Sequence, residues 1–99
     1  MTTPDYESRI AENFARQGLM QTLDARIEEV APGRCVISAP ITPGVSQQQG
    51  FAHAGFGFSL GDSAAGYAAL SLMPADADVV SIEVKINLLR PAIGTRLIA

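Results

Sequence analysis

The chain is poor in several residue types on which common sites depend. Among its 99 residues it has one cysteine, one histidine and no tryptophan. The single Cys35 excludes an internal disulfide, and one histidine with one cysteine excludes the usual zinc ligand sets. Cys35 falls in a strand-like pattern with no base near it in sequence, so we interpret it as a packed residue rather than a nucleophile.

Charge is also scarce. Only 17% of the residues are charged, the formal net charge is −3, and no run of basic residues occurs. This balance argues against a nucleic-acid surface. The first residues are polar and acidic, unlike a secretory signal, so a cytoplasmic location is expected. We treat residues 1–99 as one domain, which would gain from dimerisation because so short a chain buries only a modest core.

The apolar pattern predicts an α+β domain. Residues 1–18 are expected to form an N-terminal amphipathic helix that Gly18 ends. Alternation of apolar and polar residues then predicts strands at 19–30 and 34–41, joined as a hairpin by the turn Ala31-Pro32-Gly33.

The strongest alternation in the chain covers residues 79–89, which are expected to form a long strand. A turn at 90–94 follows, and a further strand is expected to begin at Thr95. The predicted architecture is an antiparallel sheet wrapped around one long central helix.

That helix is predicted from an apolar, small-residue stretch that begins near Ala54. Asp62 and Tyr67 are its only ionisable side chains between Gly55 and Leu72. The stretch is either a buried core helix or a membrane span. The charge in its middle and the amphipathic segment after it favour the core helix. A buried carboxylate is costly, so Asp62 needs either hydrogen-bond partners or a chemical role.

The same stretch suggests a site for acyl transfer. Backbone amides at Ala54 and Gly55 are unsatisfied donors at a helix N-terminus, where they favour developing negative charge. A carboxylate such as Asp62 acts either as a general base on water or as a nucleophile. His53 and Asp62 are nine residues apart, roughly 13–14 Å along a helix, so they cannot touch within one protomer. A site shared across a two-fold interface is the expectation.

Two runs resemble a known family: Q-x-x-G-F-A-H-A-G-(x)6-D-S-A-A-G-Y-A-A and S-I-E-V-K-I-N-L-L-R-P-A-x-G. They are similar to the hotdog-fold acyl-CoA thioesterases of the PaaI-like, phenylacetate-pathway type. The resemblance implies a cofactor-free enzyme, without a metal, that hydrolyses aryl- or fatty-acyl-CoA thioesters as a homodimer or homotetramer. It implies neither a nucleic-acid nor a membrane partner.

The resemblance also assigns roles by position. Asp62 looks like the catalytic acid, and Ala54 looks like the residue whose backbone N–H polarises the thioester carbonyl. Gln47 falls where the family has an asparagine that orients the water or the carbonyl, and Ser81 falls where some members use a hydroxyl to assist the water. Gln47 and Ala54 would come from one subunit, and Asp62 and Ser81 from its partner.

Further residues are expected to contact the substrate. Gln48 is an alternative to its neighbour Gln47, and His53 and Gly55 flank the amide that receives the carbonyl. His53 also has a simpler interpretation, as a helix-start residue that fixes the turn by hydrogen bonds. Lys85 and Arg90 are candidates for contacts to the phosphates of coenzyme A.

The chain departs from the family pattern in three ways. Glutamine replaces asparagine at Gln47, so the amide reaches one methylene further. Ala54 replaces the first glycine of the family's H-G-G, which keeps the backbone donor but reduces the clearance for substrate. Family members are also longer, so the domain is expected to be truncated, with the last strands of the sheet missing.

Two other functions stay open on the same fold. One is a non-catalytic acyl-CoA-binding or regulatory protein. The other is a hydratase or dehydratase, but those members typically carry D-(x)4-H, whereas His53 here precedes Asp62 by nine residues. Release of free thiol from an acyl-CoA distinguishes hydrolysis from both.

Overall fold

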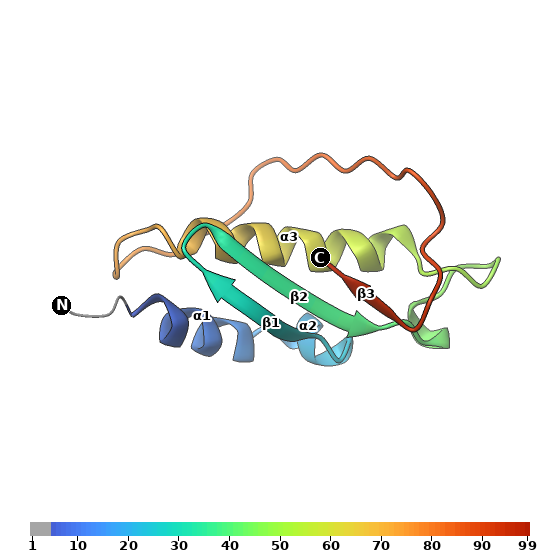
Figure 1. Ribbon diagram of the computed structural model, residues 1–99, viewed down its shortest axis with the longest axis horizontal. Coiled ribbons are helices and arrows are strands. Elements are labelled where there is room, and N and C mark those ends of the chain that lie inside the picture. Colours follow the sequence, from blue (N-terminus) through green and yellow to red (C-terminus); the bar gives the residue numbers. More distant parts are fainter. Residues whose placement is uncertain (1–4) are drawn as a thin grey trace.

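The computed structural model describes residues 5–99. Its elements, in chain order, are helices α1 (Tyr6–Ala15) and α2 (Gly18–Thr22), strands β1 (Arg26–Ala31) and β2 (Arg34–Pro40), the 3-10 turn η1 (Pro43–Val45), helix α3 (Ala54–Leu70) and strand β3 (Arg96–Ile98). The three strands form one antiparallel sheet in the order β1-β2-β3, with α3 packed across β2 (Figure 1). The predicted α+β class and the long central helix are therefore confirmed.

The hairpin of β1 and β2 forms where the sequence predicts it. Ala31 and Arg34 pair across the turn, and Gly33 has φ +76°, a left-handed conformation that glycine adopts without steric cost. The register shifts by one residue at Glu28, which makes a β-bulge in β1. The Gly33 N–H also donates to Ser71 Oγ at 2.7 Å, so the hairpin turn is held against the C-terminal end of α3.

The core lies between α3 and β2. Apolar side chains recur on α3 every three or four residues and are buried there: Phe56, Leu60, Ala64, Tyr67 and Leu70. They meet Ile37 and Ala39 of β2, and Ile10 and Met20 add the N-terminal helices to the same cluster. Burying one such large side chain contributes about 1.5–3 kcal/mol, which outweighs the roughly 1 kcal/mol cost of each glycine within α3.

Two sequence predictions are wrong at the N-terminal end. The first helix ends at Ala15 rather than at Gly18, and Gly18 instead begins α2. The strand predicted for 19–30 starts only at Arg26. The helical turn of α2 places Met20, which is 1% exposed, in the core, and local alternation cannot detect such a tertiary contact. Residues 1–4 of the predicted first helix lie outside the described residues.

The strand predicted for residues 79–89 is also wrong. Within the described chain, 5–99, this segment pairs with no strand, although strand β3 does form just after it, where predicted. In Figure 1 it is the orange-to-red line that runs above α3. Its alternating apolar side chains are exposed, 85% for Val80 and 99% for Ile82. A strand requires hydrogen-bond partners as well as alternation, and neighbouring strands supply none here.

Helix α3 buries five of its side chains in the core, as the core-helix interpretation requires. None of the helices between residues 5 and 99 has both the length and the apolar character needed to cross a bilayer.

Candidate functional site

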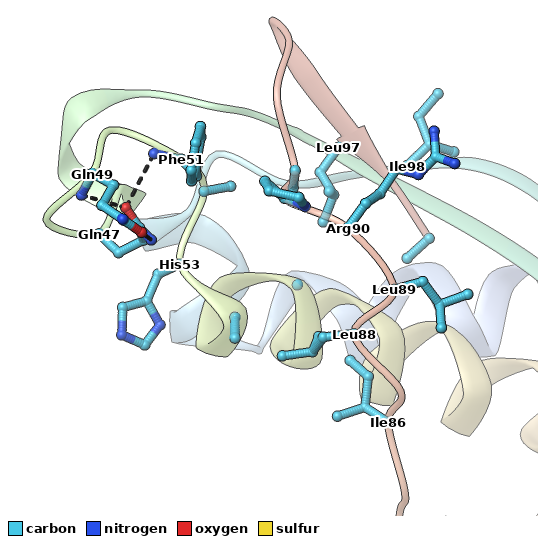
Figure 2. Close-up of a pocket in the computed structure, with 16 residues that line it drawn as sticks. Gln47, Gln49, Phe51, His53, Ile86, Leu88, Leu89, Arg90, Leu97 and Ile98 are labelled. Carbon is cyan, nitrogen blue, oxygen red and sulfur yellow. Dashed lines mark hydrogen bonds between the residues drawn. The ribbon is translucent and has the colours of Figure 1, made fainter.

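The loop before α3 is a small closed unit. Ser46 and Ala52 pair as an isolated bridge, and the Gln47 N–H donates to the Phe51 carbonyl at 2.8 Å. The Gln47 side-chain oxygen accepts from the backbone N–H groups of Gln49, at 2.5 Å, and Phe51, at 3.2 Å (Figure 2). The Gln47 carboxamide therefore fixes the shape of its own loop, while the neighbouring Gln48 is exposed at the tip.

His53 caps the N-terminus of α3. Its Nδ1 atom accepts from the Gly55 N–H at 2.8 Å, which confirms the interpretation of His53 as a helix-start residue. A Cβ at Gly55 would lie 3.1 Å from that Nδ1 atom, so glycine leaves room for the imidazole. Because the Gly55 N–H is engaged, the Ala54 N–H is the donor left without an acceptor among the described residues.

A cavity of about 680 Å³ adjoins this helix start, and we call it the mouth cavity. It lies between the 47–54 loop, residues 86–92 and β3 (Figure 2). Ile86, Leu88 and Leu97 make much of its wall apolar, and Ala54 and Arg90 also line it. The His53 imidazole points away from the Ile86 and Leu88 side chains in Figure 2.

Asp62 and Ser81 form the second group of candidate residues. The Ser81 hydroxyl donates to Asp62 Oδ1 at 2.6 Å, although 19 residues separate the two in sequence. Both line a second cavity of about 400 Å³, which we call the polar cavity. Asp62 is half-buried on α3, and Ser81 is exposed at the start of the unpaired segment. The half-buried carboxylate thus has a hydrogen-bond partner and still faces open space.

The structure divides the predicted site into two parts. Gln47, His53 and Ala54 lie together at the mouth cavity, and Asp62 lies with Ser81 at the polar cavity. Ala54 and Asp62 are eight residues apart on one straight helix, roughly 12 Å along its axis.

Other predicted residues lie outside these two groups. Gly55 faces a shallow neighbouring hollow, and Lys85 and Gln48 line neither cavity.

Sequence reasoning missed the rest of the polar cavity. Its lining also includes Asn13 and Gln17 from the N-terminal region and Tyr67 from α3. The Tyr67 hydroxyl accepts from Gln17 Nε2 at 2.7 Å and donates to Asn13 Oδ1 at 2.8 Å. The spacing of Asn13 and Gln17, one helical turn apart, and a lone tyrosine in an apolar helix were the available signals. Neither indicates that the two segments meet.

Burial affects two further titratable groups, Tyr67 and Cys35. It raises the pKa of Tyr67, which therefore stays a neutral hydrogen-bonding group. It also raises the pKa of the Cys35 thiol, which supports a packing role for that residue. Within residues 5–99, His, Cys, Asp and Glu do not gather in a group of three that would suit a metal ion.

Comparisons with known proteins place the chain. The family model described as "Thioesterase superfamily" matches residues 49–98. A thioesterase family protein from Silicibacter pomeroyi is 45% identical, with a TM-score of 0.92 over 94% of this chain and 68% of its own. A search of curated proteins gives no match.

Two further solved structures are more distant. The PaaI protein of the E. coli phenylacetic acid degradation operon is 22% identical, with a TM-score of 0.84 over 95% of this chain and 67% of its own, a likeness of fold alone. A mutant of a thioesterase enzyme from Staphylococcus aureus is 25% identical, with a TM-score of 0.77 over 83% of this chain and 69% of its own. The chain spans about two thirds of each of these structures.

Proposed function

The chain belongs to the thioesterase superfamily and has the hotdog fold, and from this premise we propose that it hydrolyses acyl-CoA thioesters to a free acid and coenzyme A. The observation that carries the proposal is the 2.6 Å hydrogen bond from Ser81 to the Asp62 carboxylate at the open polar cavity. A thioester is an activated acyl group, and the proposed hydrolysis uses one oriented carboxylate and one amide donor.

In the proposed reaction the Ala54 N–H binds the thioester oxygen and stabilises its negative charge as the carbonyl carbon becomes tetrahedral. Asp62 either removes a proton from the attacking water or attacks the carbon itself. On the first route the C–S bond of the tetrahedral intermediate breaks, and the leaving thiolate of coenzyme A takes up the proton that Asp62 removed. On the second route the thiolate leaves first, and water then hydrolyses the acyl–Asp62 anhydride to the free acid, with its proton passing to the thiolate. The Ser81 hydroxyl holds one carboxylate oxygen, so the other is free to act. For Gln47 to orient the water or the carbonyl, its carboxamide must give up at least one of its hydrogen bonds to the Gln49 and Phe51 N–H groups.

The separation of the two groups on α3 supports a shared site. Atoms roughly 12 Å apart on one straight helix cannot act on the same carbon, but helices that pair antiparallel across a two-fold axis bring a start beside a middle. The exposed apolar side chains of residues 79–89, which include Ile82 at 99% exposure, support such self-association. We therefore propose a homodimer or homotetramer in which each site uses Ala54 of one subunit and Asp62 of another.

Coenzyme A would enter from the side of the mouth cavity. Arg90 lines that cavity and Lys85 is exposed nearby in sequence, so both are proposed to contact its phosphates. Gln48, His53 and Gly55 are proposed to contact the substrate around the amide donor. A substrate of this kind fits a cytoplasmic enzyme.

Replacing the carboxylate tests the chemistry. Asp62→Asn keeps the shape of the side chain but removes its basicity, so release of thiol from butyryl-CoA and benzoyl-CoA should fall about 10²–10⁴-fold. Asp76→Asn removes the same charge from an exposed loop and should keep full activity. Full turnover by Asp62→Asn would remove Asp62 from the mechanism, and saturable binding without thiol release by the wild type would favour the non-catalytic binder.

Removing the amide tests the sharing of the site. Ala54 is the first residue of α3, where proline is well tolerated, and His53 has ψ 141°, which a following proline allows. Ala54→Pro should therefore keep the helix and lose about 10²–10³-fold in turnover. When it is refolded with an equal amount of Asp62→Asn, half the dimers are mixed and each has one intact site, so about a quarter of wild-type activity should return. No recovery would place both groups in one subunit.

A further inference from the structure

The polar cavity contains a chain of hydrogen bonds that all run in one direction. Ser63 Oγ donates to Gln17 Oε1 at 3.3 Å, and Gln17 Nε2 donates to the Tyr67 hydroxyl at 2.7 Å. Tyr67 donates in turn to Asn13 Oδ1 at 2.8 Å, and Asn13 Nδ2 donates to Asp78 Oδ1 at 3.4 Å. Each donated hydrogen bond fixes the orientation of the side chain that accepts it. The network therefore holds the carboxamides of Gln17 and Asn13 in one arrangement.

This hydrogen-bond network begins next to Asp62, the proposed catalytic residue. Ser63 follows Asp62 on α3, and Tyr67 lines the same cavity as both. Tyr67 is only 3% exposed, and its ring packs edge-on against Phe14 with 6.2 Å between centroids, so its hydroxyl is held at a fixed position. A ligand group near the Tyr67 hydroxyl would thus lie in the same cavity as the Asp62 carboxylate.

The unused hydrogen-bonding capacity indicates what such a ligand would present. Gln17 and Asn13 each keep a second N–H after donating once, and the Tyr67 oxygen keeps one lone pair. The free N–H groups need an acceptor oxygen, which a bare cation lacks. The carboxylates of Asp62 and Asp78 at the same cavity disfavour an anion such as phosphate. An uncharged hydroxyl or amide group satisfies both conditions.

We propose that the polar cavity is a subsite for an uncharged hydrogen-bonding group of the substrate, in the same cavity as Asp62 and the thioester carbon it acts on, with Gln17, Tyr67 and Asn13 as its specificity-determining residues. The assignment of that carbon rests on the proposed function. The group has two possible sources: a hydroxyl far along the acyl chain, or the first amide of the pantetheine arm. Both have the chemistry described, and substrate pairs distinguish them.

The acyl source is tested with 6-hydroxyhexanoyl-CoA and heptanoyl-CoA, which have equal numbers of heavy atoms and differ in a terminal hydroxyl. The thiol source is tested with the heptanoyl thioesters of N-acetylcysteamine and of pentanethiol, of equal chain length with and without the amide. Wild-type kcat/KM should favour the polar member of one pair about tenfold. Tyr67→Phe and Gln17→Met keep the packing and should bring the ratio of kcat/KM within that pair close to one.

Tyr6→Phe, which removes the other tyrosine hydroxyl outside the cavity, should keep the preference. Equal rates within both pairs for the wild type, or a preference that survives in Tyr67→Phe and Gln17→Met alike, would overturn the subsite. If the wild type hydrolyses none of the four thioesters, the proposed function fails. The subsite is then tested by calorimetry with non-hydrolysable thioether analogues of the same four compounds. The ratio of the dissociation constants of the polar and apolar analogues is compared between the wild type and the same three variants.

Discussion

Strand β2 and residues 79–89 are two extended segments with similar sequence patterns and opposite surroundings. β2 pairs on both sides, with β1 and β3, and buries Ile37 completely. Residues 79–89 alternate more regularly but pair with nothing in the described chain, and Ile82 is 99% exposed. Alternation places side chains on two faces, whereas a strand also needs a neighbour for its backbone. The difference shows that alternation without a neighbouring strand leaves the apolar side chains of residues 79–89 exposed.

The comparison is tested most strongly by amide hydrogen exchange. The Ile37 and Ala99 N–H groups are bonded to each other's carbonyls at 2.8 Å and should exchange about a thousandfold or more slower than in an unfolded chain, at every protein concentration. The amides of residues 80–88 should exchange fast in dilute solution and become protected as copies associate. Protection independent of concentration would reveal a partner within the chain, and fast exchange at all concentrations would exclude this segment as the interface.

A matched pair of isoleucine substitutions comes next. Ile37→Ala leaves a cavity in the core and should lower the free energy of unfolding by about 2–5 kcal/mol. Ile82→Ala should change it by about 0.5 kcal/mol or less in the dissociated chain and instead weaken self-association. Denaturant titration measures the first effect and sedimentation velocity the second. Equal destabilisation by both changes would show that Ile82 is buried within one chain.

The smallest effect expected is on acid stability. The Ser38 hydroxyl donates to Glu28 and Arg26 pairs with it at 3.0 Å, and these hydrogen bonds lower the pKa of Glu28 below its ordinary value of 4.5. A lowered pKa gives stability that is present above that ordinary value and is lost as the pH falls through the folded-state pKa. In Glu28→Gln the free energy of unfolding should therefore fall less steeply with decreasing pH below pH 4.5 than in the wild type.

Glu83→Gln on the unpaired segment is the control for this change, and it should leave the acid branch of the stability curve as in the wild type. Thermal unfolding followed across the acid range measures both variants. Identical curves for Glu28→Gln and the wild type would contradict a role for the contact between Ser38 and Glu28.

Much of the fold was predictable because its signals are local. The helical recurrence of apolar residues after His53, the Pro32-Gly33 turn and the alternation around Ile37 each depend on near neighbours, and all three elements form. The strand prediction for residues 19–25 failed because α2 forms there and packs Met20 into the core against residues distant in sequence. No pattern in the N-terminal segment itself reports that contact.

The candidate site likewise has residues that the sequence indicates and contacts that only the structure reveals. The family motif drew attention to Asp62, Ala54, Gln47 and Ser81, but the roles it implies are still predictions. The contact of Ser81 with Asp62 joins residues 19 positions apart, and the network of Gln17, Tyr67 and Asn13 joins residues about 50 apart. Such polar contacts have no periodicity along the chain, so only the packed structure reveals them.

The sequence by itself determined the central helix, the β1–β2 hairpin and the presence of one carboxylate in an apolar helix, because spacing and turn chemistry act over a few residues. Only the tertiary structure decided that Ser81 meets Asp62, that Ala54 and Asp62 face different cavities, and that residues 79–89 pair with no strand within residues 5–99. These outcomes depend on which distant surfaces meet, and that is a property of packing across the whole chain.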